Sequence, residues 1–326
     1  MSHRCALGLV AGLVGSSLAL ALMAAGAAAA GTPTCSDFLK ISTLPRVAAM
    51  GEAAVAVGDA TWAEVNPANL TSIEGSLVTF THTAWFQDIS LETMSLGTSS
   101  GRHGFGVALS GLHTEPLEEY DSEDVHTGQF RYYDFLVAAT YARRVLPSLT
   151  VGGTAKVIYE RIGWDSASGL AFDLGLVHAR QIGFLRGEVS GGLVMRNLGS
   201  KMGYFEEKYD LPLTWQGGLA YRAGWLPSAL AALVAVDYRT TREGERGVLV
   251  GAELGFMRTF TLRAGAKSTS GVTRDGGDAT VGLGARIRNL TLDYAYADFG
   301  DKLGATHRVS LGISAGAILP FPEASR

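Results

Sequence analysis

Long apolar runs are missing from this sequence after its first 30 residues. A helix needs about 20 apolar residues to cross a bilayer, and the best later stretch, residues 228–236, is bounded by Pro227 and Asp237. Cysteine is scarce as well, with two in the whole chain, which excludes a disulfide scaffold. A basic excess is also lacking, because 27 Lys and Arg face 31 Asp and Glu. We therefore expect no nucleic-acid partner.

The first 30 residues have the pattern of a secretory signal peptide. Arg4 precedes an apolar run over residues 6–23, and the small residues that end at Ala30 suit a signal peptidase. We predict cleavage near Ala30; the alternative is an N-terminal membrane anchor. Cys5 would leave with the signal, so the exported chain would keep only Cys35 and no internal disulfide. The mature protein is then either soluble outside the cytoplasm or crosses a membrane as strands.

The remaining chain alternates apolar with small or polar residues, which is the two-residue period of a strand with one apolar face. Glycine is abundant, at 42 residues, and this disfavours helix bundles. We predict strands near residues 76, 89, 103, 131, 149, 168, 186, 212, 229, 246, 259, 278, 290 and 306. Each strand with its connection takes about 17 residues, which suits a tilted transmembrane strand of about 9 to 11 residues plus a turn. A soluble sandwich, the alternative, repeats faster.

The connections also alternate in length. Those after even-numbered strands are short, whereas several after odd-numbered strands are long: residues 113–129, 197–212, 268–278 and 297–306. Short turns at one rim and long loops at the other are typical of outer-membrane barrels, whose ends lie on the periplasmic side. The predicted fold class is therefore all-β, a transmembrane antiparallel β-barrel of about 14 strands in the bacterial outer membrane, in contact with its lipid and lipopolysaccharide.

One face of the predicted strands is apolar and the other collects charges of both signs. The candidate lumen-facing charges are Lys156, Glu160, Asp173, Arg222, Asp237, Arg263, Arg286 and Arg308. Mixed-sign ladders inside a narrow barrel pair with one another and hold a plug. The alternative is that these charges form a specific ligand site.

Residues 38–70 differ in sequence pattern from the barrel segments, and they carry a family resemblance. They begin Phe38-Leu39-Lys40-Ile41, continue through Ala49-Met50-Gly51-Glu52-Ala53, and end Asn66-Pro67-Ala68-Asn69-Leu70. This resembles the opening of the PorV/PorQ family of bacterial outer-membrane proteins, which is similar in turn to the FadL group of hydrophobic-compound transporters. The chain departs from the family pattern at two glycines in the first stretch and at Asn69. Residues 292–296 and 304–312 resemble the last two strands of the family.

The resemblance implies a 14-stranded barrel over residues 76–316, a plug over residues 31–75 and a tail over residues 317–326. The candidate plug residues are Arg46, Met50, Gly51, Asp59, Trp62, Asn66, Pro67 and Ala68. Two functions are implied. PorV-like members act in type IX secretion, where exported cargo proteins and secretion-system subunits would be partners. FadL-like members admit hydrophobic molecules, and a hydrophobic ligand would then be the partner. We expect the secretion role, with hydrophobic transport as the alternative.

The sequence shows no catalytic residues and implies no cofactor. Residues 312–316 match the G-x-S-x-G pattern, but only ten residues follow and none is a histidine, so the acid and base of a nucleophile elbow are missing. A hydrolase with a Ser-His pair built across strands is a third hypothesis that no feature supports. The seven histidines lack metal-ligand spacing, so no metal site is expected. The acidic run over residues 115–124 is interpreted as a solvated loop, with a calcium-binding loop as the alternative.

Overall fold

The computed structural model describes residues 31–85, 89–204, 206–270, 279–298 and 304–316. The predicted signal peptide and tail lie outside these ranges. In chain order the elements are η1 (Asp37–Lys40), α2 (Pro45–Ala49), η2 (Asp59–Ala63), η3 (Pro67–Ser72), β1 (Gly75–Ala84), β2 (Ile89–Ser99), β3 (His103–Thr114), β4 (Leu117–Tyr120), β5 (His126–Phe130), β6 (Tyr132–Leu146), β7 (Leu149–Ile162), β8 (Asp165–Ile182), η4 (Gly183–Leu185), β9 (Gly187–Gly199), β10 (Thr214–Ala223), β11 (Leu230–Thr241), β12 (Arg246–Phe256), β13 (Phe260–Ser270), β14 (Ala279–Ile287), β15 (Leu290–Asp298) and β16 (Ala305–Ala315). None of the helices in the described ranges is long and apolar enough to cross a membrane.

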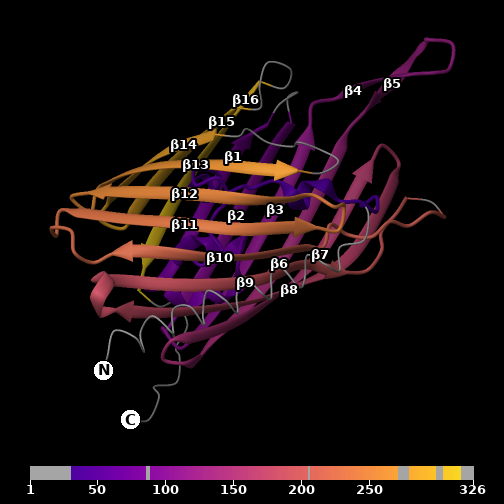
Figure 1. Cartoon of the computed structure of the whole chain (residues 1–326). Helices are drawn as coiled ribbons and strands as arrows, with labels where there is room; N and C mark the ends of the chain where they lie inside the picture. Colours follow the sequence, from indigo (N-terminus) through magenta and orange to yellow (C-terminus); the bar gives the residue numbers. More distant parts are fainter. Residues whose placement is uncertain (1–30, 86–88, 205, 271–278, 299–303, 317–326) are drawn as a thin grey trace.

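Fourteen antiparallel strands close into a barrel (Figure 1). Each strand pairs with its neighbours in the chain, β3 pairs with β6 across the β4–β5 hairpin, and β1 pairs with β16 to close the ring. At the closure Phe80 lies opposite Leu311. The predicted fold class is confirmed, and the barrel strands begin within about three residues of their predicted places. The two-residue period was sufficient to locate the strands, because a shift of the register by one residue would turn their apolar face inward.

The two rims of the barrel differ. The short-turn rim carries the connections after β2, β6, β8, β10, β12 and β14, and the long-loop rim carries the others. On the long-loop rim the acidic run is exposed to solvent, and part of it forms β4, which pairs with β5 as a projecting hairpin instead of an irregular loop (Figure 1). Glu118 accepts hydrogen bonds from Gln129 at 2.7 Å and pairs with His126 at 2.5 Å. These partners offset the mutual repulsion of the acidic side chains.

The strands turn apolar side chains outward and polar ones inward. On β1, Phe80 is 44% exposed, whereas Thr79 and Thr81 are buried. On β3, Val107 and Leu109 are likewise exposed on the outer face. The outer surface is therefore an apolar belt, and the large exposed apolar side chains that a water-soluble domain would avoid are spread around the whole ring.

Residues 31–74, called the plug below, fill the inside of the barrel (Figure 1). The helix α2 packs against β13 to β16, and η3 packs against β2, β3 and β6 to β8. The approach is close enough to require glycine in the wall: a Cβ placed on Gly265 would lie 2.0 Å from the backbone nitrogen of Gly51, and one on Gly152 would lie 2.6 Å from the backbone of Pro67. The wall glycines thus fit the plug backbone directly against the strands.

Candidate functional site

Asn66 fixes the end of the plug to the barrel wall. Its side chain is fully buried, and its amide donates to the carbonyl oxygen of Val55 at 2.9 Å and to that of Leu176 at 3.2 Å. Its side-chain oxygen accepts a hydrogen bond from the backbone nitrogen of Ala68 at 3.1 Å and so caps η3. Since Leu176 belongs to β8, one side-chain amide connects two parts of the plug and one strand.

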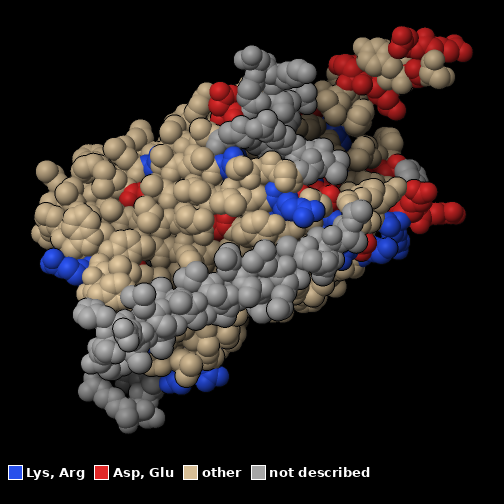
Figure 2. All heavy atoms as spheres, in the orientation of Figure 1, with Lys and Arg blue, Asp and Glu red and all other residues tan. Residues whose placement is uncertain are grey.

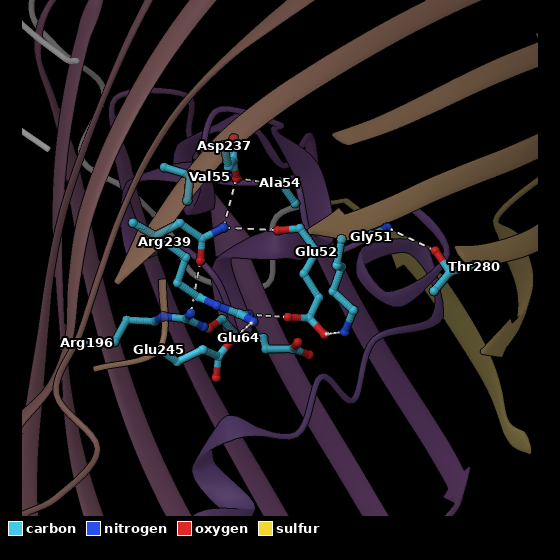
Figure 3. A network of polar contacts seen from close by, with 12 residues as sticks. Gly51, Glu52, Ala54, Val55, Glu64, Arg196, Asp237, Arg239, Glu245 and Thr280 are labelled. Atoms are coloured by element: carbon cyan, nitrogen blue, oxygen red, sulfur yellow. Dashed lines mark hydrogen bonds and ion pairs between the residues drawn. The ribbon is translucent and has the colours of Figure 1, made fainter. Parts of the chain in front are cut away.

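Glu52 forms the centre of a buried ion-pair cluster between the plug and two strands (Figure 3). Its carboxylate lies 2.6 Å from the Nζ of Lys267 and also pairs with Arg239, which in turn contacts Glu245 at 3.0 Å. Burial alone would raise the pKa of Glu52, but the charges of Lys267 and Arg239 outweigh it and hold the pKa well below its usual range. The carboxylate therefore remains ionised, and the plug carries a fixed negative charge at this point.

Asp237 holds the next stretch of the plug. Its Oδ2 accepts hydrogen bonds from the backbone nitrogens of Ala54 at 2.9 Å and Val55 at 3.0 Å (Figure 3). The side-chain amide of Gln216 donates to the same oxygen at 2.8 Å and to the carbonyl oxygen of Glu52 at 3.0 Å. Two neighbouring strands, β10 and β11, thus satisfy plug backbone groups that would otherwise be buried without partners.

A second ion-pair cluster holds α2. Arg46 donates to both oxygens of Glu253, at 2.9 and 3.0 Å, in a fork-like arrangement. Arg263 contacts the same carboxylate at 2.7 Å and Asp293 at 2.6 Å. Positive and negative side chains alternate in this cluster. Glu253 of β12 holds α2 through Arg46, and Arg263 of β13 holds Glu253 in place.

A third set of contacts lies on other strands. Lys156 pairs with Asp173 at 2.7 Å and donates to Asn197 at 2.8 Å, which connects β7, β8 and β9. Arg308 donates from β16 to the carbonyl oxygen of Ser42 in the plug at 2.7 Å. Nearly the whole circumference of the barrel is therefore cross-linked by polar contacts, either to the plug or between strands.

The structure brings most of the predicted lumen charges into these clusters, but not all. Lys156, Glu160, Asp173, Asp237, Arg263 and Arg308 face inward and are largely buried. Arg222 and Arg286 lie outside these clusters, exposed at the short-turn rim, where they border a hollow inside the barrel. Among the predicted plug residues, Arg46, Met50, Gly51, Trp62, Asn66, Pro67 and Ala68 all pack inside the barrel, while the side chain of Asp59 lies outside the described part.

The candidate site residues did not include Glu52, its partners Arg239 and Lys267, or the amide of Gln216. A signal was present for Glu52, because it stands where the PorV/PorQ pattern has a glycine. A carboxylate that replaces glycine in a segment surrounded by lumen cations indicates an ion pair. The partners could not be assigned from sequence, since which strand meets which plug residue depends on how the plug folds.

A chamber of about 840 Å³ lies inside the barrel toward the short-turn rim. The plug residues Leu44, Arg46 and Ile73 form part of its lining, and the wall contributes Thr79 and Phe260 among others. Exposed arginines stand at its mouth: Arg222, Arg258, Arg286 and Arg288. The chamber thus has a mixed apolar and polar lining, with exposed arginines at its mouth.

A groove of about 500 Å³ lies on the outer surface of β1, β2, β3, β6 and β16. Outward-facing Phe80, Met94 and Leu109 line it, and the inward-facing Thr81 and Thr93 also reach it. Its lining is far more apolar than polar. The wall beneath the groove is continuous, because β1 pairs with β2 and β2 with β3 along their full lengths.

Charge is distributed unequally between the rims (Figure 2). The acidic side chains of the β4–β5 hairpin project at one end of the molecule, whereas the short-turn rim is basic. Its exposed arginines are Arg102, Arg143, Arg144, Arg180, Arg186, Arg222, Arg258, Arg286 and Arg288. Within the described ranges, no three His, Cys, Asp or Glu side chains gather in a metal-binding arrangement.

Comparison with known proteins shows which solved structures share this fold. The model of an uncharacterised protein family, UPF0164, matches residues 23–172. No curated protein matches the sequence. The Pseudomonas putida toluene transporter TodX superposes with a TM-score of 0.60 at 10% identity, over 83% of this chain and 98% of TodX. The monoaromatic hydrocarbon channel CymD gives a TM-score of 0.57 at 12% identity, over 84% and 98%. The fold is thus similar to that of these two hydrocarbon transport proteins, and membership of the PorV/PorQ family is not shown.

Proposed function

We propose that this protein is a bacterial outer-membrane channel for hydrophobic small molecules. The barrel fold that it shares with TodX and CymD supports this function, as do its apolar outer belt and its plugged lumen. The short-turn rim would face the periplasm and the β4–β5 hairpin the cell exterior, as in other outer-membrane barrels. The comparisons give no support to the secretion-docking hypothesis, which stays a prediction.

The observation that carries this proposal is the position of the two hollows. The outer groove and the inner chamber both border β1, where Thr81 lines the groove and Thr79, two residues away, lines the chamber. An apolar solute dissolved in the membrane would collect in the groove, since its walls are apolar. At β1, the solute in the groove would be separated from the chamber only by the thickness of this strand. The chamber itself opens toward the short-turn rim.

The groove also has a polar feature that a lipid-facing surface does not need. His82 and Glu92 both point outward, about half exposed, with Nδ1 and Oε1 2.7 Å apart. Ionisable side chains on a lipid-facing surface are costly, so their presence marks a functional position. Both residues line the groove, and they would hold its end next to water or a polar group of the solute.

Filling the groove tests this function. Gly111 lines it and faces outward, and a Cβ at this position would meet Phe135 at 3.8 Å, so a larger side chain can be accepted. Gly153 on β7 is a matched control, because it also faces outward with its nearest contact at 3.5 Å and lies away from the groove. Uptake of radiolabelled toluene would be measured in cells that lack their own hydrocarbon channel and express the wild type, Gly111→Phe or Gly153→Phe.

We expect the wild type and Gly153→Phe to raise the initial uptake rate several-fold above the empty vector, and Gly111→Phe to return it to the vector level. Equal amounts of folded barrel in the outer-membrane fraction are the control for expression. Full uptake by Gly111→Phe would exclude the groove as the route. A wild type no faster than the vector, for toluene and for a long-chain alkane, would contradict the channel function itself.

A further inference from the structure

Two carboxylates face each other inside the barrel without a positive charge between them. Asp134 on β6 and Glu160 on β7 are direct partners in the register of these strands. Both point inward, and they are 2% and 3% exposed. Like charges directly opposite one another destabilise a pair of strands, and the burial of an uncompensated charge adds to that cost. Either a bound cation or a bound proton would remove this cost.

The neighbouring side chains that the structure describes do not supply a cation. Tyr132 donates to one oxygen of Asp134 at 2.7 Å, and Tyr204 donates to one oxygen of Glu160 at 3.2 Å. The other two oxygens, Oδ1 of Asp134 and Oε1 of Glu160, are buried without any partner. Over the described ranges neither carboxylate forms an ion pair, and Lys156, the cation of β7, is paired with Asp173 instead.

The surroundings restrict what can bind. Tyr132 and Tyr204, which hydrogen-bond to the pair, pack against a buried apolar cluster that includes Leu112, Ile158 and Met202. Packing there is tight, since a Cβ on Gly169 would lie 2.5 Å from the Met202 side chain. Packing this close disfavours a bulky organic cation.

We propose that Asp134 and Glu160 bind one hard divalent cation, and calcium in the first place. Carboxylate oxygens are the ligands that calcium prefers, and its flexible coordination allows hydroxyl groups and water to complete the set. Tyr132 and Tyr204 would orient the two carboxylates, as hydrogen bonds to metal ligands commonly do. Because Tyr204 belongs to the β9–β10 connection, the ion would fasten that connection over the long-loop end of the lumen. The site is separate from the proposed transport route and does not depend on it.

The test uses the full-length mature chain, purified in detergent and stripped of divalent ions with EDTA. Terbium replaces calcium at oxygen-ligand sites and emits when nearby tyrosines are excited, so Tyr132 and Tyr204 report its binding. We expect the emission to titrate to one strong site and calcium to displace it. The double variant Asp134→Asn/Glu160→Gln should weaken terbium binding by at least about tenfold, since loss of even an indirect partner has that effect. Calcium should also raise the Tm of the wild type in a concentration-dependent way and leave that of the double variant unchanged.

The acidic hairpin provides the matched control. Glu119→Gln/Glu123→Gln removes two exposed carboxylates, and it should leave the strong site intact. Loss of terbium binding in this variant, with retention in Asp134→Asn/Glu160→Gln, would show surface binding and overturn the proposal. A wild-type Tm that does not respond to calcium, together with a double variant that is more stable than the wild type, would show that the pair holds a proton and would equally overturn it. Should the double variant fail to fold, Glu160→Gln alone is titrated and is held to the same outcomes.

Discussion

Glu52 of the plug and Lys267 of β13 are 215 positions apart in the sequence, and their side chains form an ion pair of 2.6 Å inside the barrel. Glu52 also pairs with Arg239 on β11. Since β11 and β13 are the two neighbours of β12, Glu52 connects the plug to strands on both sides of β12. Because the contact is buried, salt and water screen its charges only weakly, and removal of one charge leaves the others without compensation. The stability of the plugged barrel should therefore depend on these few side chains.

Glu52→Gln should destabilise the barrel more than any single exposed substitution. The change leaves Lys267 buried without its carboxylate and Arg239 with only Glu245. Removal of one partner from a buried ion pair costs about 3–5 kcal/mol. Urea unfolding in detergent, followed by tryptophan fluorescence, would measure this loss. An effect below about 1 kcal/mol, the range of exposed pairs, would mean that water screens the cluster.

The same variant isolates a pH dependence. The pKa of Glu52 is lowered in the folded protein from its ordinary value of 4.5, so below that value the unfolded chain binds a proton that the folded chain does not. The contribution of Glu52 to stability is thus complete above about pH 5 and decreases as the pH falls below about 4.5. The difference in unfolding free energy between the wild type and Glu52→Gln should be constant from pH 8 to pH 5 and should narrow at pH 4 and pH 3. A difference that widens on acidification would contradict the assigned ion pairs.

The α2 cluster predicts an order of effects. Glu253→Gln leaves both Arg46 and Arg263 without the carboxylate that they share, although Arg263 retains Asp293. Arg46→Gln leaves Glu253 paired with Arg263 and should therefore cost less. A double-mutant cycle on the same unfolding assay should give a coupling energy of about 1–3 kcal/mol between Arg46 and Glu253. Equal single effects with no coupling would mean that α2 is held by its apolar contacts.

The strand pattern could be predicted from the sequence because each barrel strand has one lipid-facing and one lumen-facing side. Leu109 and Ser110 on β3 show the principle, since consecutive residues must point to opposite faces. The hairpin β4–β5 could not be predicted in this way. Glu118 and Glu119 place acidic side chains on both faces of β4, and all four residues of this strand are exposed, so no burial pattern distinguishes a strand from a loop there.

The candidate site was less predictable than the fold. The alternating pattern placed Asp173 and Lys156 on the lumen face. It placed Arg222 and Arg286 on the same face, although the structure puts these two at the rim of the barrel. The difference lies in how far along the strand each residue stands relative to the plug, and that depends on the tilt and register of all 14 strands. Contacts such as Asn66 to Leu176 join segments 110 residues apart, which periodicity cannot reveal.

Asn66 should be intolerant of even its closest replacement. Asn66→Asp keeps the oxygen that caps η3 but loses the donations to Val55 and Leu176, and it buries a negative charge against two carbonyl oxygens. Asn66→Ala loses the cap and both donations without adding a charge, at a cost of about 1–3 kcal/mol. We expect the order wild type, Asn66→Ala, Asn66→Asp in resistance of the plug to trypsin, which would cut after Lys40 or Arg46 once the plug leaves the lumen. Protection of Asn66→Asp equal to that of the wild type would refute this role.

Gly265 should be the wall position where the smallest change releases the plug. A methyl group there would lie 2.0 Å from the nitrogen of Gly51, and because backbone cannot rotate away as a side chain can, either the plug or β13 must shift. Gly265→Ala should therefore cost about 1–3 kcal/mol, as overpacking does, and should expose the plug to trypsin. Gly153→Ala provides the control, since its nearest contacts are 3.5 Å away on the outer face and the same methyl group should be accepted. If the two alanine variants unfold at the same urea concentration and the plug remains protected in both, then the plug can move away from β13 at little cost, and close packing against this strand is not what holds it.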